Sequence, residues 1–102
     1  ETVFRLAKNS CDFIQCKSLD RKNVIVEDGY VGEGYAIPTE GMKKALKLMA
    51  RKEAILLDPV YSGQAFDGLI DLVKKGYFKD SDKILFIHTG RSAAIPAYEW
   101  AF

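Results

Sequence analysis

The sequence predicts an α/β fold in which parallel strands lie between helices. Segments with apolar residues at helical spacing alternate with short, continuous apolar runs. The runs show no apolar-polar alternation, which is typical of parallel strands covered on both faces. With 102 residues, of which 48% are hydrophobic, the chain can form one small domain or part of a larger core.

The first predicted element is a helix over residues 3–15. Its apolar residues recur at spacings of three, four and three and form one stripe: Phe4, Ala7, Cys11 and Ile14. We expect Cys11 to pack in a core as a small apolar side chain. Cys11 and Cys16 fit neither a zinc spacing nor a disulfide framework, and this favours a reduced, cytoplasmic protein.

The next elements are a strand, a glycine-containing loop and a helix. The run 24–26 is β-branched and predicts a buried strand, and a loop follows from Gly29 to Pro38. Thr39 occupies a helix N-cap position. Apolar residues at i, i+3, i+4 and i+7 then predict a helix that ends near Lys52-Glu53: Met42, Ala45, Leu46 and Met49.

The last elements repeat this alternation. The apolar run 54–57 is stopped by Asp58-Pro59, and a helix follows the turn at 61–63. The apolar face of this helix is wide, so we expect cover on more than one side. Gly76 is a candidate left-handed cap, and 84–87 is the clearest strand.

Several function classes are excluded by composition and motif spacing. Fifteen basic and fourteen acidic residues, with no long basic run, argue against nucleic acid as a partner. The apolar runs are too short to span a membrane. The loop glycines do not spell a dinucleotide fingerprint, because Ile37 and Pro38 follow Gly34. The single His88 has no neighbouring ligands, so no metal site is expected.

Three stretches carry a family resemblance: residues 32–39 (Gly-Glu-Gly-Tyr-Ala-Ile-Pro-Thr), 57–63 (Leu-Asp-Pro-Val-Tyr-Ser-Gly) and 88–90 (His-Thr-Gly). Together they resemble the C-terminal part of the D-cysteine desulfhydrases and 1-aminocyclopropane-1-carboxylate deaminases, which use pyridoxal 5'-phosphate. The resemblance runs from about Val24 to Tyr98. It implies that residues 1–102 are one segment of a three-layer α/β sandwich with parallel strands, as in tryptophan synthase beta-like (fold type II) enzymes.

The resemblance also implies what this segment lacks. The family's Schiff-base lysine and phosphate-binding glycine loop lie in earlier segments, so the 102-residue chain alone is expected to be inactive. The intact enzyme would use the rest of the same protein as a partner, form a homodimer and act on a small amino acid. It would have no nucleic-acid or membrane partner.

The same resemblance assigns site residues. It implies that Tyr35 faces the substrate and that Tyr61 lies against the cofactor ring and handles a proton, which makes both catalytic candidates. Without the resemblance, each is an ordinary half-buried or turn tyrosine. Cofactor binding is assigned to Tyr61, Ser62 and Thr89, with hydroxyls near the pyridine nitrogen. The alternative for Ser62 is a helix cap, and for Thr89 an ordinary residue at a strand end.

The hydroxyl residues favour one branch of the family. The deaminases place Glu directly after the motif tyrosine and lack the threonine, whereas this chain has Ser62 and Thr89. This predicts D-cysteine desulfhydrase-like β-elimination. The alternatives are the cyclopropane deaminase, a serine dehydratase-like activity, or a non-catalytic α/β fragment or binding module. Two residues depart from the family pattern: Arg91 stands where a second glycine is usual, and Ala36 replaces a common glycine, with an ordinary backbone conformation expected there.

Overall fold

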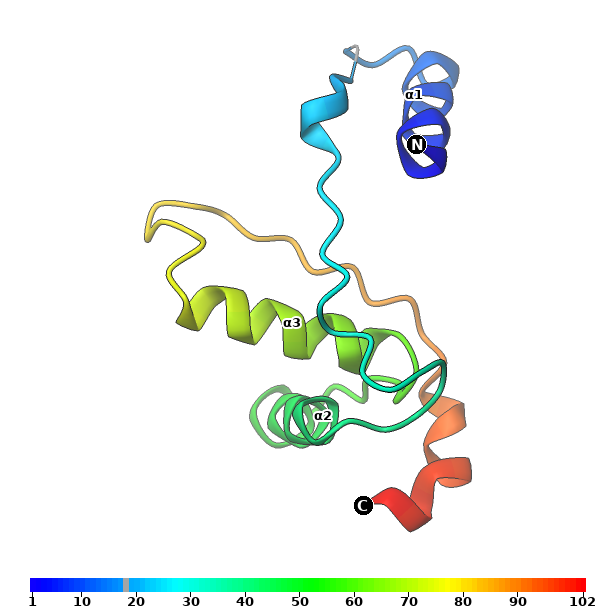
Figure 1. The fold of residues 1–102 in the computed structure, drawn as a ribbon, viewed down its shortest axis with the longest axis vertical. Helices are drawn as coiled ribbons and strands as arrows, with labels where there is room; N and C mark the ends of the chain where they lie inside the picture. Colours follow the sequence, from blue (N-terminus) through cyan, green and yellow to red (C-terminus); the bar gives the residue numbers. More distant parts are fainter. Residues whose placement is uncertain (18) are drawn as a thin grey trace.

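The structure, a computed structural model, describes residues 1–17 and 19–102. It contains three α-helices and two 3-10 helices (Figure 1). In chain order these are α1 (Thr2–Phe13), η1 (Arg21–Asn23), α2 (Glu40–Glu53), α3 (Ser62–Lys74) and η2 (Ser92–Ala101). None of the described helices combines the length and the apolarity needed to cross a bilayer.

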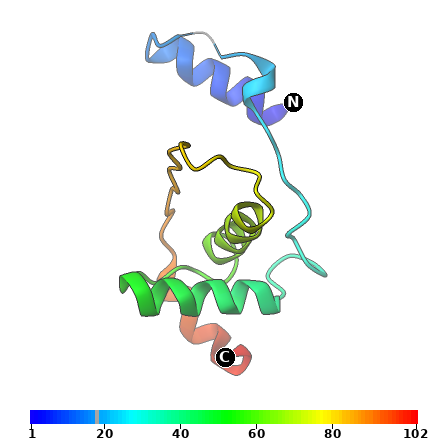
Figure 2. The same cartoon turned by 90° about the vertical axis from the view of Figure 1, so that its left-hand side faces the viewer.

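The core lies where α2 and α3 cross. α2 is seen nearly end-on in Figure 1 and α3 nearly end-on in Figure 2, so the two helices cross steeply. Met42, Leu46 and Leu57 form the buried cluster. Three partly buried side chains pack against it: Met49, Phe66 and Phe86. The rings of Phe66 and Phe86 meet edge to face at 5.3 Å, which ties the segment after α3 to the helix itself.

The predicted three-layer sandwich with parallel strands is wrong for the described residues, because they contain no strand. Residues 24–26 and 84–87 were predicted as strands, but no backbone hydrogen bond between them or to 54–57 is present among these residues. A strand requires a ladder of backbone partners, and none of these segments supplies one to another. Most of the side chains in 24–26 and 84–87 are exposed, with Leu85 at 85% exposure.

The three predicted α-helices are confirmed, and so are their main boundary signals. The Thr39 hydroxyl accepts a hydrogen bond from the Met42 amide at 3.1 Å and caps α2. Gly76 has φ +71° just after α3, in the left-handed region. Ala54 ends α2 with φ +56°, which explains why no extended run begins at that residue.

Helix α3 is covered on more than one side, as expected: it packs against α2, the Tyr30 ring lies against Gly68, and Phe86 meets Phe66. Its fully buried residues are Ser62, Gly63 and Gly68, and none of its apolar side chains is fully buried.

One expectation about the backbone is wrong. Ala36 has φ +61° rather than an ordinary conformation. The left-handed region costs a residue with a side chain about 1–2 kcal/mol. The Ala36 carbonyl accepts a hydrogen bond from the Tyr98 hydroxyl at 3.2 Å, which links this turn to η2.

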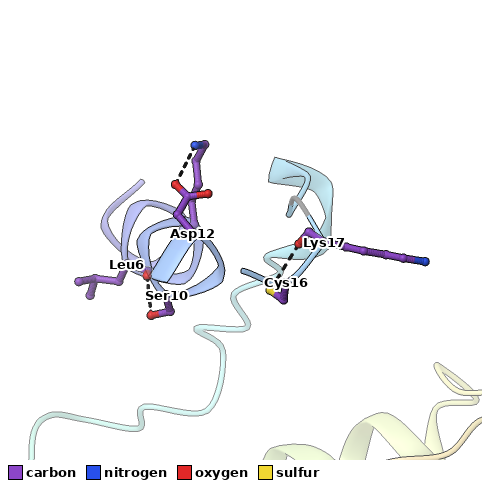
Figure 3. Close-up of polar contacts among 6 residues, drawn as sticks. Leu6, Ser10, Asp12, Cys16 and Lys17 are labelled. Atoms are coloured by element: carbon purple, nitrogen blue, oxygen red, sulfur yellow. Dashed lines mark hydrogen bonds and ion pairs between the residues drawn. The ribbon is translucent and has the colours of Figure 1, made fainter. Parts of the chain in front are cut away.

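Helix α1 lies apart from α2 and α3 in both ribbon views (Figures 1 and 2). It buries no residue, so the predicted core packing of Cys11 is wrong: Cys11 is only partly covered. Contacts within this region are local. The Ser10 hydroxyl donates to the Leu6 carbonyl at 2.9 Å, and the Cys16 thiol lies 3.5 Å from the Lys17 carbonyl (Figure 3). Arg21 lies over the Phe4 ring at 5.8 Å and connects η1 to α1.

Candidate functional site

Tyr35 and Tyr61 meet at the centre of the candidate site. Their hydroxyls are 2.7 Å apart, within hydrogen-bond distance, and their rings are 6.0 Å apart in an edge-on arrangement. The residues are 26 positions apart in the sequence, and both stay open to solvent, Tyr35 at 72% and Tyr61 at 44% exposure. The structure therefore brings together the two residues assigned as catalytic.

The hydrogen bond between the two phenols affects how tightly Tyr35 holds its proton. The bond to Tyr61, together with the nearby Tyr61 phenol, raises the pKa of Tyr35, and Arg91 acts in the opposite direction. Tyr35 keeps its proton more tightly when its O–H donates to Tyr61. In that arrangement the O–H of Tyr61 remains free to point away from the pair.

Asp58 fixes the backbone at Tyr61. Its side chain is fully buried, and its oxygen Oδ2 accepts from the amides of Val60 and Tyr61, both at 2.9 Å. Oδ1 accepts from the Ser62 amide at 2.8 Å and from the Ser62 hydroxyl at 2.6 Å. The carboxylate thus binds the otherwise free amides at the start of α3 and complements the positive end of the helix dipole. This explains why the Tyr61 side chain leaves a turn with little backbone freedom.

Burial and hydrogen bonding oppose one another at Asp58. Burial raises the pKa of this carboxyl, while hydrogen bonds from Ser62, Tyr61 and Val60 lower it, and the balance lies below the ordinary value of 3.8. The carboxylate is therefore held in its charged form inside the protein. Gly63 is required beside it, because a Cβ at that position would lie 2.7 Å from the Asp58 carbonyl oxygen.

Ser62 belongs to this buried network and not to the open face of the site. Its hydroxyl donates to Asp58 and also accepts from the Asp58 amide at 2.8 Å, and the residue is 3% exposed. The role of Ser62 toward a pyridine nitrogen stays a prediction. The observed contacts match the alternative noted from the sequence, a residue that stabilises the first turn of α3.

The loop after the last extended segment is held by His88. The Gly90 amide donates to His88 Nδ1 at 3.1 Å, so Nδ1 is an acceptor. Nε2 then carries the proton and donates to the Leu56 carbonyl at 3.0 Å. His88 in this tautomer bridges residues 56 and 90 and directs the following loop toward Tyr61. Thr89, the predicted cofactor contact in this loop, is exposed.

Arg91 completes the cluster. Its guanidinium carbon lies 4.9 Å from the centroid of the Tyr61 ring, a cation–π distance. Arg91 adopts φ +66° and ψ +17°, in the left-handed region. The sequence showed that an arginine replaces the usual glycine, but not that its guanidinium lies on the tyrosine pair.

Tyr61 also lines a cavity of about 490 Å³. The cavity lies between residues 27–31 and α3, and its walls are mainly apolar. Leu69 and Leu72 contribute to it, together with Gln64, whose buried Nε2 has no hydrogen-bond partner among the described residues. Tyr30 closes one side and is fixed by a 2.7 Å hydrogen bond from its hydroxyl to Asp71. Tyr61 therefore lines this apolar cavity and also contacts Tyr35 and Arg91.

Sequence reasoning missed the part played by Asp58 and His88. Asp58 was interpreted as part of a family motif and as the residue before a proline, although an aspartate just before a helix start can accept bonds from the nearby backbone amides. His88 was considered as part of the family motif at 88–90 and as a metal ligand, but not as a residue that fixes the loop. No local signal indicates its 32-residue link to Leu56.

Most of this chain matches a known protein family. The family model described as "Pyridoxal-phosphate dependent enzyme" matches residues 3–90, which is most of the chain. The motifs at Tyr35, Tyr61 and Thr89 all fall within the matched range.

Curated relatives match almost the whole chain. A 1-aminocyclopropane-1-carboxylate deaminase from Bradyrhizobium diazoefficiens is 38% identical over 101 residues, which cover 98% of this chain and 30% of the relative. Proteins of the same name from Rhizobium rhizogenes and Variovorax paradoxus are each 35% identical, with the same 30% of their length covered. The chain therefore spans about 30% of the length of these relatives.

Proposed function

Because the chain belongs to the family of pyridoxal-phosphate dependent enzymes, we propose that it forms one wall of the active site in an intact lyase that acts on a small amino acid. The observation that carries this proposal is the hydrogen-bonded pair of Tyr35 and Tyr61. Two phenols from distant parts of the chain meet on an open face, next to a cation and an apolar cavity.

The residues present fit pyridoxal phosphate in part. Tyr61 offers a partly exposed ring that can lie against a planar heterocycle, and Thr89 offers an exposed hydroxyl. Ser62 does not offer its hydroxyl, because Asp58 occupies it. When bound, the cofactor supplies delocalisation of negative charge from the substrate's α-carbon. This segment would contribute a ring surface, a hydroxyl and a proton donor.

Tyr61 is suited to give a proton to a departing or rearranging group. When Tyr35 is the donor of their hydrogen bond, the Tyr61 hydroxyl keeps a proton to donate elsewhere. General acid catalysis of this kind typically contributes about 10²- to 10⁴-fold to rate. Asp58 holds the tyrosine in place through its backbone amide, so the donor is pre-positioned.

For the substrate we propose D-cysteine, converted with water to pyruvate, ammonia and hydrogen sulfide. Support comes from the resemblance: Thr89 stands at the position typical of the desulfhydrase branch, and no glutamate follows Tyr61. The second candidate is 1-aminocyclopropane-1-carboxylate, supported by the names of the relatives at 35–38% identity. We further propose that the rest of the same enzyme completes the site and that the intact protein is a homodimer.

The test is to assay the intact protein that contains this segment on both substrates. Sulfide release from D-cysteine and 2-oxo acid formation from the cyclopropane substrate are measured side by side, together with the visible absorption of bound cofactor. Sulfide release with slow ring opening is the expected result. Ring opening without sulfide release would favour the second candidate. A protein that binds the cofactor but converts neither substrate would favour a binding module.

Ser62 and Thr89 can be separated in the same protein. Thr89→Val should shift the cofactor's absorption or weaken its binding, whereas Ser62→Ala should lower stability and leave the spectrum unchanged, because its hydroxyl contacts Asp58. A spectral shift in Ser62→Ala would restore the predicted cofactor role of this residue.

A further inference from the structure

Arg91 is a cation without an acidic partner in the described part of the chain. The ion pairs formed there use other basic residues: Lys8, Arg21, Lys22, Lys43 and Lys75. Its guanidinium lies on the Tyr61 ring and is close enough to Tyr35 to oppose the rise in the pKa of that phenol. A guanidinium presents five N–H donors in a planar fork, and stacking on one ring face uses none of them, so donors remain to bind an oxyanion.

The backbone at Arg91 gives a second, independent observation. Its φ of +66° lies in a region that glycine adopts at no steric cost, so the arginine carries backbone strain. His88 and Gly90 hold the loop in this shape through their hydrogen bond. Backbone strain lowers the stability of the folded protein. Stability therefore does not explain why an arginine occupies this position in an exposed loop that is otherwise fixed.

We propose that Arg91 is a substrate-binding residue that binds a carboxylate of the amino acid beside the Tyr35–Tyr61 pair. This inference rests on the proposed function for the presence of an amino acid at this face. Every amino acid carries an α-carboxylate, and acidic ones carry a second. A residue that binds the second carboxylate would extend the substrate range toward acidic amino acids.

The experiment measures binding and not turnover. The intact, cofactor-loaded protein is titrated calorimetrically with D-alanine, which has one carboxylate, and D-aspartate, which has two. Arg91→Gln removes the charge at similar length, and Arg51→Gln removes a charge from the exposed end of α2 as the matched control. We expect Arg91→Gln to weaken binding by about 10- to 100-fold, as for the loss of a charge-assisted hydrogen bond, and the control to bind as the wild type does.

The pattern of loss identifies the carboxylate. Weaker binding of both ligands places the α-carboxylate on Arg91, and weaker binding of D-aspartate alone places the second carboxylate there. Unchanged binding of both, or no binding of either to the wild type, would overturn the inference. A loss of affinity for pyridoxal phosphate but not for pyridoxal, with amino-acid binding unchanged, would also overturn it, because the bound anion would then be the cofactor's phosphate.

A glycine variant separates binding from stability. Arg91→Gly should lose the same affinity as Arg91→Gln while its melting temperature stays equal or rises, because glycine relieves the positive φ. A lower melting temperature in both variants with unchanged affinity would show a purely structural arginine. Failure of the proposed function would look different, since a protein without lyase activity can still bind D-aspartate through Arg91.

Discussion

Replacement of Asp58 by asparagine should destabilise the protein, because the buried carboxylate accepts four hydrogen bonds. An asparagine has one acceptor oxygen. If that oxygen takes the place of Oδ2, it accepts the hydrogen bonds from the amides of Val60 and Tyr61. The new NH₂ group then faces the Ser62 amide, so a buried donor is left without an acceptor. Such a loss costs about 1–3 kcal/mol, and the loss of charge assistance adds to it, so we expect a fall of about 2–3 kcal/mol in unfolding free energy.

The alanine variant should lose more. Four bonds at a net contribution of about 1 kcal/mol each give about 4 kcal/mol for Asp58→Ala. The assay is urea unfolding of the intact protein followed by circular dichroism. Asp82→Asn is the matched control, because Asp82 accepts one bond from the Lys79 amide at 2.8 Å on the exposed surface. Surface changes of this kind stay within about 0.5 kcal/mol. Equal, small losses in Asp58→Asn and Asp82→Asn would refute the argument.

The stability that the Asp58 carboxylate contributes should decrease in acid. The pKa of Asp58 is lowered in the folded protein, so its contribution to stability is complete above its ordinary pKa of 3.8 and is lost as the pH falls below that value. The difference in stability between wild type and Asp58→Asn should therefore shrink on the acid side. A constant difference from pH 7 to pH 3 would contradict the charged network.

Three residues carry the remaining predictions. Tyr61→Phe should reduce kcat about 10²- to 10⁴-fold with little change in cofactor affinity, and wild-type turnover would exclude a proton-handling role. The same variant should lower the pKa of Tyr35 toward its ordinary value, seen by NMR titration of labelled tyrosine; an unchanged pKa would mean that the 2.7 Å bond is not formed in solution. Thr39→Ala should cost about 1 kcal/mol by loss of the α2 cap, measured by urea unfolding, with no effect expected on turnover. Gly63→Ala should cost about 1–3 kcal/mol by overpacking against Asp58 and Met42, and wild-type stability would show that the turn can relax.

Local signals predicted the helices well because a helix satisfies its own backbone. The Thr39 cap, the apolar spacing of α2 and the turn at Gly76 all act within a few residues, and each is seen in the structure. The predicted strands failed for the opposite reason. A run such as 84–87 has the right side chains, but its backbone needs a partner from elsewhere, and the described segments provide none to one another.

The site shows the same division between local and distant information. Tyr35 and Tyr61 were selected by their resemblance to family motifs, and no periodicity in the sequence indicates that residues 26 apart share a hydrogen bond. The network around Asp58 is local and could have been predicted from the position of this aspartate just before a helix start. The position of Arg91 depends on a positive φ and on His88, and neither is visible in residue types alone.

The open extended segments also bear on how the polypeptide behaves while it is being made. Residues 84–87 (Ile-Leu-Phe-Ile) have no charge, no proline and no glycine, and three of the four side chains are largely exposed. Short, uncharged runs of this kind join other chains through their free backbone groups and start β-aggregates. Lys83 and His88 flank the run and can act as gatekeepers. We therefore expect chaperones to bind this run during synthesis, until its backbone groups form hydrogen bonds within the folded protein.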